Sequence, residues 1–183
     1  MEQKKLLVVT GPSGAGLREI VAAVIDGRDD VGQATPVTAR KMKPGERDGA
    51  GYYFYDLEGW NALKESGDLL ETTELAGNDY GTSRRIVCGQ LAAGRHVVLN
   101  LEPERAAQLK RNMPEALCVY MEPSSPALLR ARYEQSCRSG FEVEVRMELA
   151  ERQRAQSGFC DCRIPSDEPE AAVRALNALL DGE

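Results

Sequence analysis

Three short apolar runs recur along the chain, separated by longer stretches that mix apolar and polar residues. The runs occupy residues 6–10, 97–101 and 117–121, contain β-branched residues and carry no charge. Largely apolar runs of this length indicate strands that are buried on both faces of a sheet. Each run is followed by a segment with helical potential. Because strands that alternate with helices form parallel sheets covered on both faces, the pattern predicts an α/β fold.

The segment between the first and second runs has a different amino-acid composition. Residues 38–82 are rich in glycine, tyrosine and charge, and they hold shorter strand-like pieces such as Tyr-Tyr-Phe-Tyr at residues 52–55. We therefore predict an inserted subdomain over residues 35–82, within a core formed by residues 1–34 and 83–183.

Helical patterns dominate the C-terminal third of the chain. Residues 125–156 are helical in composition, with six arginines and an interruption at residues 136–140 that contains two serines and a glycine. A helix, a flexible tip and a second helix predict a hinged lid over about residues 126–156. Apolar residues recur at helical spacing over residues 170–180, which predicts an amphipathic closing helix.

Length and charge restrict the classes of function. The chain has 183 residues, 42% of them hydrophobic, which favours a single domain with one sizeable core. Its net charge of -6 is opposite in sign to that of proteins that bind nucleic acid or anionic membranes, so we expect neither partner. No apolar stretch approaches the roughly 20 residues needed to cross a bilayer, and the first run is too short for a signal peptide. We expect a cytoplasmic protein whose five cysteines, an odd number, stay reduced.

A glycine-rich turn directly follows the first apolar run. Its candidate phosphate-binding residues are Gly11, Ser13, Gly14, Ala15 and Gly16. In the loop pattern G-x-x-x-x-G-K-[ST], backbone N–H groups surround phosphates, the lysine reaches the β- and γ-phosphates, and the hydroxyl holds Mg²⁺. Here Leu17 and Arg18 stand at the last two positions, and Glu19 adds negative charge where a triphosphate would lie. The glycines of the pattern are therefore present, and its charge chemistry is absent.

The order of motifs resembles that of the guanylate kinase family over nearly the whole chain. After the loop come residues 38–54, TARKMKPGERDGAGYYF, then Glu71, and then residues 77–82, GNDYGT. Members of that family carry the loop GPSGxGK, a segment similar to S-x-T-T-R-x-x-R-x-G-E-x-x-G-x-D-Y-x-F, a glutamate, and G-N-x-Y-G-[ST]. The resemblance implies the three-layer fold of P-loop nucleoside monophosphate kinases, with a central parallel sheet, an inserted GMP-binding subdomain and a helical lid.

Carried over position by position, the resemblance implies a GMP acceptor site. Its candidate residues are Arg40, Lys43, Tyr52, Glu71, Tyr80, Thr82 and Glu102. The arginine and the lysine would hold the nucleotide phosphate, with hydroxyl groups from the two tyrosines. Glu71 would accept from guanine N1–H and the exocyclic amine, while Thr82 would bond O6, since a buried carboxylate discriminates against a base with the wrong edge. Lys43 stands where the family has a second arginine, so it keeps the charge without the bidentate fork.

The same resemblance places larger departures in the donor half of the site. Phosphoryl transfer relies on a lysine, Mg²⁺ ligands and lid arginines to neutralise charge on the migrating group. Asn100 stands where the family has the first aspartate of D-x-D, and Ser166 where it has an asparagine that faces adenine. The candidate catalytic residues are Arg18, Arg132, Arg138 and Arg146. The last three lie close to the family's lid positions, and the first is a candidate substitute for the missing lysine. Salt bridges with neighbouring glutamates on a solvated helix face are the alternative for the lid arginines.

These observations favour a protein that binds GMP, or a related guanine nucleotide, and transfers phosphate from ATP poorly or not at all. On this interpretation Mg²⁺ and ATP are needed only if the chain is active. Three alternatives stay open. The first is an active guanylate kinase in which Arg18 or a lid arginine supplies the missing charge. The second is a kinase-dead module that grips a protein partner, and the third is a sensor of guanine nucleotides.

Three further features have structural interpretations. Cys160 and Cys162 flank Asp161 but lack four ligands at zinc spacing, so we predict no metal site. His96 begins an apolar run and is interpreted as a structural residue. Trp60 is predicted to pack a helix of the insert rather than to stack on a base.

Overall fold

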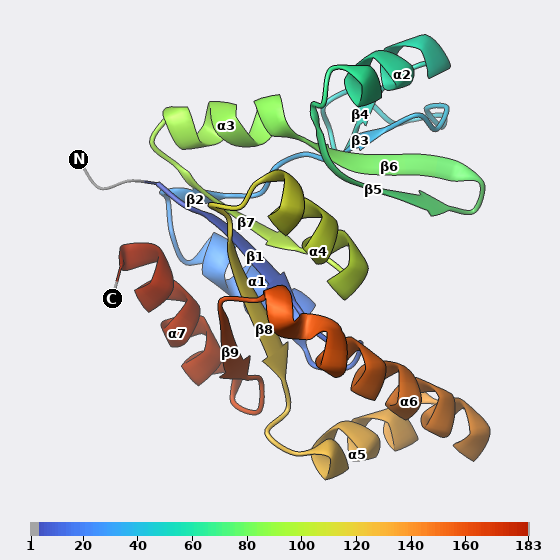
Figure 1. The fold of residues 1–183 in the computed structure, drawn as a ribbon, viewed down its shortest axis with the longest axis vertical. Coiled ribbons are helices and arrows are strands. Elements are labelled where there is room, and N and C mark those ends of the chain that lie inside the picture. The colour runs from blue at the N-terminus through green and yellow to red at the C-terminus, as the bar shows by residue number, and fades with distance from the viewer. Residues whose placement is uncertain (1–3, 183) are drawn as a thin grey trace.

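The computed structural model describes residues 4–182 and contains a central parallel sheet (Figure 1). Its strands, in spatial order, are β2 (Val31–Gly32), β7 (His96–Asn100), β1 (Leu6–Thr10), β8 (Leu117–Glu122) and β9 (Cys162–Pro165). Every pair of neighbours is parallel. The three apolar runs form the three inner strands, as their lack of charge predicts. The pattern did not indicate the two outer strands, because β2 has two residues and the side chains of β9 are partly or fully exposed.

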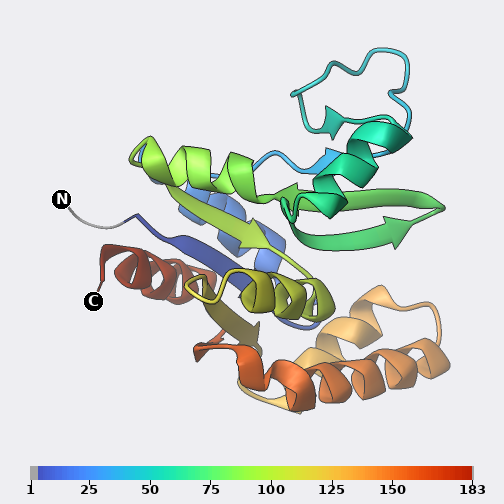
Figure 2. The ribbon, with the colours of Figure 1, turned by 45° about the horizontal axis from the view of Figure 1, so that its top comes forward.

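Helices cover both faces of this sheet and form the two outer layers (Figure 2). On one face lie α1 (Leu17–Asp26) and α7 (Pro169–Asp181), and on the other lie α3 (Arg84–Ala92) and α4 (Pro103–Asn112). Side chains alternate along β1, so Leu7 and Val9 pack toward the first pair of helices and Leu6 and Val8 toward the second. The predicted α/β fold is therefore confirmed, and α7 is the amphipathic closing helix that its periodicity predicts.

A second, smaller sheet stands beside the core and comes from the region predicted as an insert (Figure 1). Its elements are β3 (Val37–Thr38), β4 (Tyr53–Phe54), α2 (Leu57–Glu65), β5 (Leu69–Leu75) and β6 (Asn78–Ser83), with strand order β4-β3-β6-β5. The sheet is mixed, since β3 pairs with β4 in parallel and with β6 in antiparallel orientation. Trp60 of α2 is fully buried in a cluster with Val37 and Leu63, as predicted for a packing residue.

The arginine-rich region folds as a helical hairpin (Figure 1). Residues 137–139 join α5 (Pro126–Ser136) to α6 (Gly140–Gln156), which continues into the short 3₁₀ helix η1 (Ser157–Phe159). Ser125 and Ser139 precede the two helices and accept hydrogen bonds from N–H groups of the first turns, which explains where each helix begins. The hairpin has a small apolar core of its own. The exact boundaries of core, insert and lid stay a prediction.

The Cys-Asp-Cys segment has a structural role. Within residues 4–182 no group of three or more His, Cys, Asp and Glu side chains is placed to hold a metal ion. Asp161 instead accepts hydrogen bonds from the ammonium of Lys110 at 2.9 Å and from the backbone N–H of Cys118 at 2.7 Å. All five cysteines are free thiols. Over the same described residues, no helix combines the length and the apolar character that a bilayer span requires.

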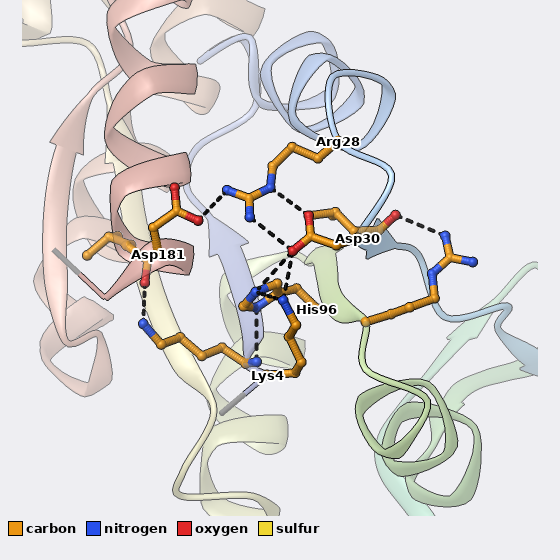
Figure 3. A network of polar contacts seen from close by, with 9 residues as sticks. Lys4, Arg28, Asp30, His96 and Asp181 are labelled. Atoms are coloured by element: carbon orange, nitrogen blue, oxygen red, sulfur yellow. Dashed lines mark hydrogen bonds and ion pairs between the residues drawn. The ribbon is translucent and has the colours of Figure 1, made fainter. Parts of the chain in front are cut away.

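A polar network joins the start of the central sheet to the last helix (Figure 3). Asp30 pairs with Lys4 at 2.8 Å and with two guanidinium nitrogens of Arg28 at 2.9 and 3.1 Å. Arg28 also donates to Asp181 of α7 at 2.7 Å. His96 is fully buried within this network, with its Nε2 atom 3.1 Å from Lys4 Nζ. The histidine therefore belongs to the packing of the sheet edge, in agreement with its structural interpretation.

Replacing Asp30 by asparagine is expected to lower the free energy of unfolding by about 1 kcal/mol at pH 7, a value that allows for solvent screening of this partly exposed carboxylate. Hydrogen bonds from Arg28 and then Lys4 hold the pKa of Asp30 well below its ordinary value of 3.8. Because the folded pKa lies below the unfolded one, the stabilisation is present above about pH 4 and is lost as the pH falls toward the folded pKa. Urea unfolding at pH 7 and at about pH 2 measures this. A difference between wild type and variant that does not shrink at the lower pH would contradict the assignment.

Candidate active site

The predicted phosphate loop forms the turn between β1 and α1, at the carboxyl edge of the central sheet. Gly11 lies so close to β8 that an added Cβ would stand 2.0 Å from the carbonyl oxygen of Met121. Gly14 has a φ of 78°, and an added Cβ there would stand 2.8 Å from the ring of Tyr133. Gly16 precedes α1 in the left-handed conformation. The free N–H groups and the positive end of the α1 dipole therefore point at this loop.

The positions around the start of α1 differ in exposure. Ala15, inside the loop, is fully buried. Leu17 is 8% exposed and packs in the apolar core between α1 and the sheet, and it also reaches the cleft above the loop. Arg18 and Glu19 are exposed and line the same cleft. A ligand in the cleft would therefore meet backbone N–H groups, one arginine and one carboxylate at the start of this helix.

The cleft above the loop has a volume of about 830 Å³. Its walls come from the phosphate loop, from the start of α4 and from the helical hairpin. The lining residues outside the loop and α1 are Asn100, Leu101, Glu102, Pro103, Glu104, Arg105, Tyr133, Arg146, Leu149 and Gln153. Asn100 ends β7 and Glu102 directly precedes α4, and both side chains are exposed. The cleft thus lies outside the carboxyl ends of the parallel strands, where open α/β sheets bind ligands.

The first helix of the hairpin contacts the phosphate loop directly. Arg132 of α5 donates to the carbonyl oxygens of Gly14 at 3.2 Å and Ser166 at 3.3 Å. The hydroxyl of Tyr133 donates to the carbonyl oxygen of Ser13 at 2.6 Å, and burial raises the pKa of this hydroxyl, which keeps it a neutral donor. Ser166 is buried, and its own hydroxyl has no hydrogen-bond partner among residues 4–182. The hairpin and the loop are therefore one connected structure.

The other two predicted lid arginines differ in position. Arg146 of α6 lines the cleft, and its guanidinium lies 5.7 Å from the ring centroid of Tyr133. It also donates to Glu142 at 2.9 Å, which is one of the salt bridges expected as the alternative to a catalytic role. Arg138 lies in the connection between the two helices, is exposed, and is not among the residues that line the cleft. The structure thus brings Arg132 and Arg146 to the loop and cleft but leaves Arg138 outside the cleft lining.

Three residues predicted to hold the acceptor phosphate gather in the insert. The guanidinium of Arg40 lies 5.7 Å from the ring centroid of Tyr52, and the ring of Tyr52 lies 5.7 Å from that of Tyr80. Arg40 also forms a two-pronged ion pair with Glu46 at 3.0 and 2.8 Å, which raises the pKa of the arginine and lowers that of the glutamate. Lys43 is exposed, and its backbone N–H donates to the same carboxylate at 2.6 Å. A phosphate at this position would share Arg40 with Glu46.

The two predicted base-reading residues face each other across β5 and β6. Glu71 and Thr82 are register partners, and Thr82 Oγ1 donates to Glu71 Oε1 at 2.6 Å. The side chain of Glu71 is fully buried and accepts two further hydrogen bonds from Arg105, from Nε to Oε2 at 2.6 Å and from Nη2 to Oε1 at 2.9 Å. Burial lowers the pKa of Arg105, but the hydrogen bond to Glu71 and the nearby negative charges outweigh it, so the net shift is upward. The arginine is therefore charged.

Arg105 is not among the site residues that the sequence predicts. This residue lies in the first turn of α4, three positions after Glu102, and lines the cleft. The positive end of a helix dipole disfavours a cation in the first turn, so an arginine at this place was a signal that a carboxylate lies nearby. No motif of the resemblance covers the position, and the partner comes from the insert, 34 residues earlier in the chain.

The fold and the site together define a class of protein. Among α/β proteins, a parallel sheet with a glycine-rich phosphate loop after its first strand, an inserted mixed sheet and a two-helix lid define the P-loop nucleoside monophosphate kinases. The sequence profile of the family described as Guanylate kinase matches residues 3–183. The chain belongs to the guanylate kinase family, which confirms the resemblance of its motifs.

Individual relatives agree with this assignment. The chain is 37% identical to the guanylate kinase of Thermobifida fusca over 180 residues, which cover 98% of this chain and 92% of that protein. It is 33% identical to the guanylate kinase of Trichormus variabilis over 179 residues, which cover 97% and 90%. Among solved structures it is similar to the crystal structure of guanylate kinase from Anaplasma phagocytophilum, with a TM-score of 0.66 and 21% identity over 100% of this chain and 87% of that chain. The last similarity supports the fold.

Proposed function

We propose that the chain binds GMP as the acceptor nucleotide of the guanylate kinase reaction, and that phosphoryl transfer from ATP is strongly weakened or lost. Relatives named guanylate kinase match nearly the whole chain, which supports this class of substrate. The observation that carries the proposal is a contrast between two parts of the site. Arg40, Tyr52 and Tyr80 gather in the insert, whereas an apolar Leu17 packs in the core at the position of the loop lysine.

The acceptor half supplies the groups that a nucleoside monophosphate needs. The arginine and the two tyrosines of the insert would bind the phosphate through charge-assisted hydrogen bonds, and Lys43 adds a flexible charge from an exposed loop. Glu71, opposite Thr82, is a buried carboxylate suited to the N–H donors of a purine edge. Glu102 would face the nucleotide from the core side of the cleft.

The donor half lacks charges that transfer needs. Bound ATP with Mg²⁺ would supply the transferred phosphoryl group, and the backbone N–H groups of the loop, Arg132 and Arg146 would remain to stabilise it. Leu17 has no donor, position 18 has no hydroxyl, and Asn100 is neutral where the family has a carboxylate. One preorganised donor is worth about 10²–10³ in rate, so several losses together leave little turnover. The residues present therefore fit a nucleoside monophosphate better than Mg²⁺ and ATP.

A second candidate is an active guanylate kinase with an unusual phosphate loop. It is favoured by the identity of 37% and 33% to proteins that carry the name guanylate kinase. It is also favoured by the position of Arg18, which is exposed and lines the cleft, where a guanidinium would take the place of the missing ammonium.

A coupled assay with ATP, Mg²⁺ and GMP separates the two candidates when it is combined with calorimetry of each nucleotide alone. We expect GMP to bind, ATP to bind much more weakly, and turnover to stay far below ~10 s⁻¹, an ordinary enzyme rate. Turnover near that rate, strictly dependent on GMP, would establish the active guanylate kinase instead. If GMP neither binds nor raises the melting temperature, both candidates fail, because a ligand of the native state must stabilise it.

A further inference from the structure

The guanidinium of Arg105 occupies both oxygens of Glu71, the carboxylate assigned above to the purine edge. Nε of the arginine lies 2.6 Å from Oε2, and Nη2 lies 2.9 Å from Oε1. The hydroxyl of Thr82 donates to Oε1 at 2.6 Å. Both carboxylate oxygens, and the hydrogen that Thr82 would offer to a base, are therefore already engaged within the protein.

The donor pattern of this contact is that of a guanine edge. Guanine presents N1–H and the 2-amino group side by side as two parallel N–H donors, and a guanidinium presents two such donors in a fixed fork. Arg105 and guanine therefore compete for the same positions on Glu71. The arginine carries a full charge, so its hydrogen bonds to the carboxylate are stronger than those of a neutral base.

The packing of α4 on β5 holds the arginine in place. One turn further along the helix, the side chain of Gln108 accepts from the N–H of Thr72 at 3.2 Å. After another turn, the side chain of Asn112 donates to the carbonyl oxygen of Leu70 at 2.9 Å. The arginine, the glutamine and the asparagine follow one face of α4 at helical spacing and bond three consecutive residues of β5. The contact with Glu71 is therefore part of the junction between core and insert.

Local charges favour the same arrangement. Arg105 lies in the first turn of α4, where the helix dipole disfavours a cation. The negative charges of Glu71 and then Glu102 act in the opposite direction and raise the pKa of the arginine. In turn, Glu71 is fully buried, and a buried carboxylate that loses its cation is strongly destabilising. Arg105 and Glu71 therefore hold each other in place.

We propose that Arg105 is a specificity-determining residue that competes with guanine for Glu71 and makes the acceptor site weakly selective among purine nucleoside 5′-monophosphates. The inference rests on the proposed function, because it requires a nucleotide phosphate at Arg40 and its neighbouring tyrosines. Phosphate binding uses those residues and not Glu71. The wild-type chain therefore binds GMP and IMP, which lacks the 2-amino group, with similar affinity.

Calorimetry of GMP and of IMP with three forms of the full chain tests this inference. In the wild type the two Kd values should agree within about threefold. In Arg105→Ala the carboxylate of Glu71 is released for the 2-amino group, so GMP should bind about tenfold to a hundredfold more tightly than IMP. Arg28→Ala is the matched control, because it removes a partly buried arginine from an ion pair at the opposite edge of the sheet. It should keep the wild-type ratio.

Arg105→Ala leaves a buried carboxylate without its cation and could fail to fold for that reason. A second variant therefore keeps the inference testable. Arg105→Lys keeps a positive charge near Glu71 but cannot bond both oxygens in a fork. Its preference for GMP over IMP should lie between those of the wild type and Arg105→Ala. The melting temperature of each form without nucleotide reports folding, and GMP should raise that of Arg105→Ala by more than IMP does.

Two results would overturn the inference while leaving the proposed function intact. One is a wild-type preference for GMP over IMP as strong as that of Arg105→Ala. The other is a ratio near one in both Arg105 variants, because Glu71 would then not contact the base. If neither nucleotide binds to the wild type or to any variant, the proposed function is rejected, and the inference with it.

Discussion

Replacing Leu17 by lysine together with Arg18 by serine is expected to raise kcat/KM for phosphoryl transfer from ATP to GMP by about 10²–10³. The double variant restores the loop pattern in which an ammonium reaches the β- and γ-phosphates and a hydroxyl holds Mg²⁺. Calorimetry should show tighter binding of ATP with no change for GMP, because neither position is among the proposed acceptor residues. A steady-state coupled assay measures the gain in rate.

The surroundings of Leu17 can accommodate this change. Its side chain is buried in the core beside α1 but also lines the cleft, so the methylenes of a lysine can follow the same path while the ammonium emerges at the loop. Leu17→Met is the control, because it keeps apolar volume without charge and should stay at the wild-type rate. Arg18→Ser alone tests whether the arginine substitutes for the lysine, in which case that variant is slower than the wild type. A correctly folded double variant that gains nothing would show that the loop charge does not limit transfer.

Replacing Trp60 by alanine should be the most damaging single change in the insert and lower the free energy of unfolding by about 3–5 kcal/mol. The indole is fully buried with Val37 and Leu63, and its Cη2 atom would stand 3.4 Å from a Cβ added at Gly81 of β6. Because β6 carries Tyr80, one of the residues proposed to bind the nucleotide phosphate, GMP binding should weaken as well. Hydrogen exchange measures the effect: amides of the insert should lose protection before those of β1, β7 and β8.

Trp60→Phe is the matched control for this prediction. It keeps most of the apolar volume, and the indole nitrogen has no hydrogen-bond partner in the part of the chain that the structure describes. The phenylalanine variant should therefore be destabilised much less than the alanine variant. Equal loss of protection in the insert and in the central sheet of Trp60→Ala would show that the two unfold as one unit, contrary to the local effect expected here.

The fold could be predicted from the sequence wherever burial leaves a continuous local pattern. The inner strands β1, β7 and β8 are apolar over three or more consecutive residues because helices cover them on both faces. The outer strands could not be predicted in this way. β2 is too short for a pattern, and β9, in which half-buried and exposed residues alternate, contains no continuous apolar run. Tertiary pairing with β7 and β8 makes these segments strands.

The candidate site was predictable to a similar degree. Arg40, Tyr52 and Tyr80 were named from the resemblance to the family, and they lie together in the insert. The ion pair between Arg40 and Glu46 was not predicted, because a sequence motif does not specify which of its side chains form ion pairs with one another. Arg138 was placed in the lid by alignment. It is exposed in the connection between α5 and α6, where its backbone N–H donates to the side chain of Glu142, and it does not line the cleft.

By itself the sequence determined the α/β fold, the glycine-rich loop and the membership of a family, because each depends on residue types within local segments and on the order of those segments along the chain. Only the tertiary structure decided that Leu17 packs in the core, that Arg132 bonds the phosphate loop, and that Arg105 pairs with Glu71. These contacts join residues from separate segments, and their geometry depends on how helices and strands pack in three dimensions. The spacing of residues along the chain does not determine that packing.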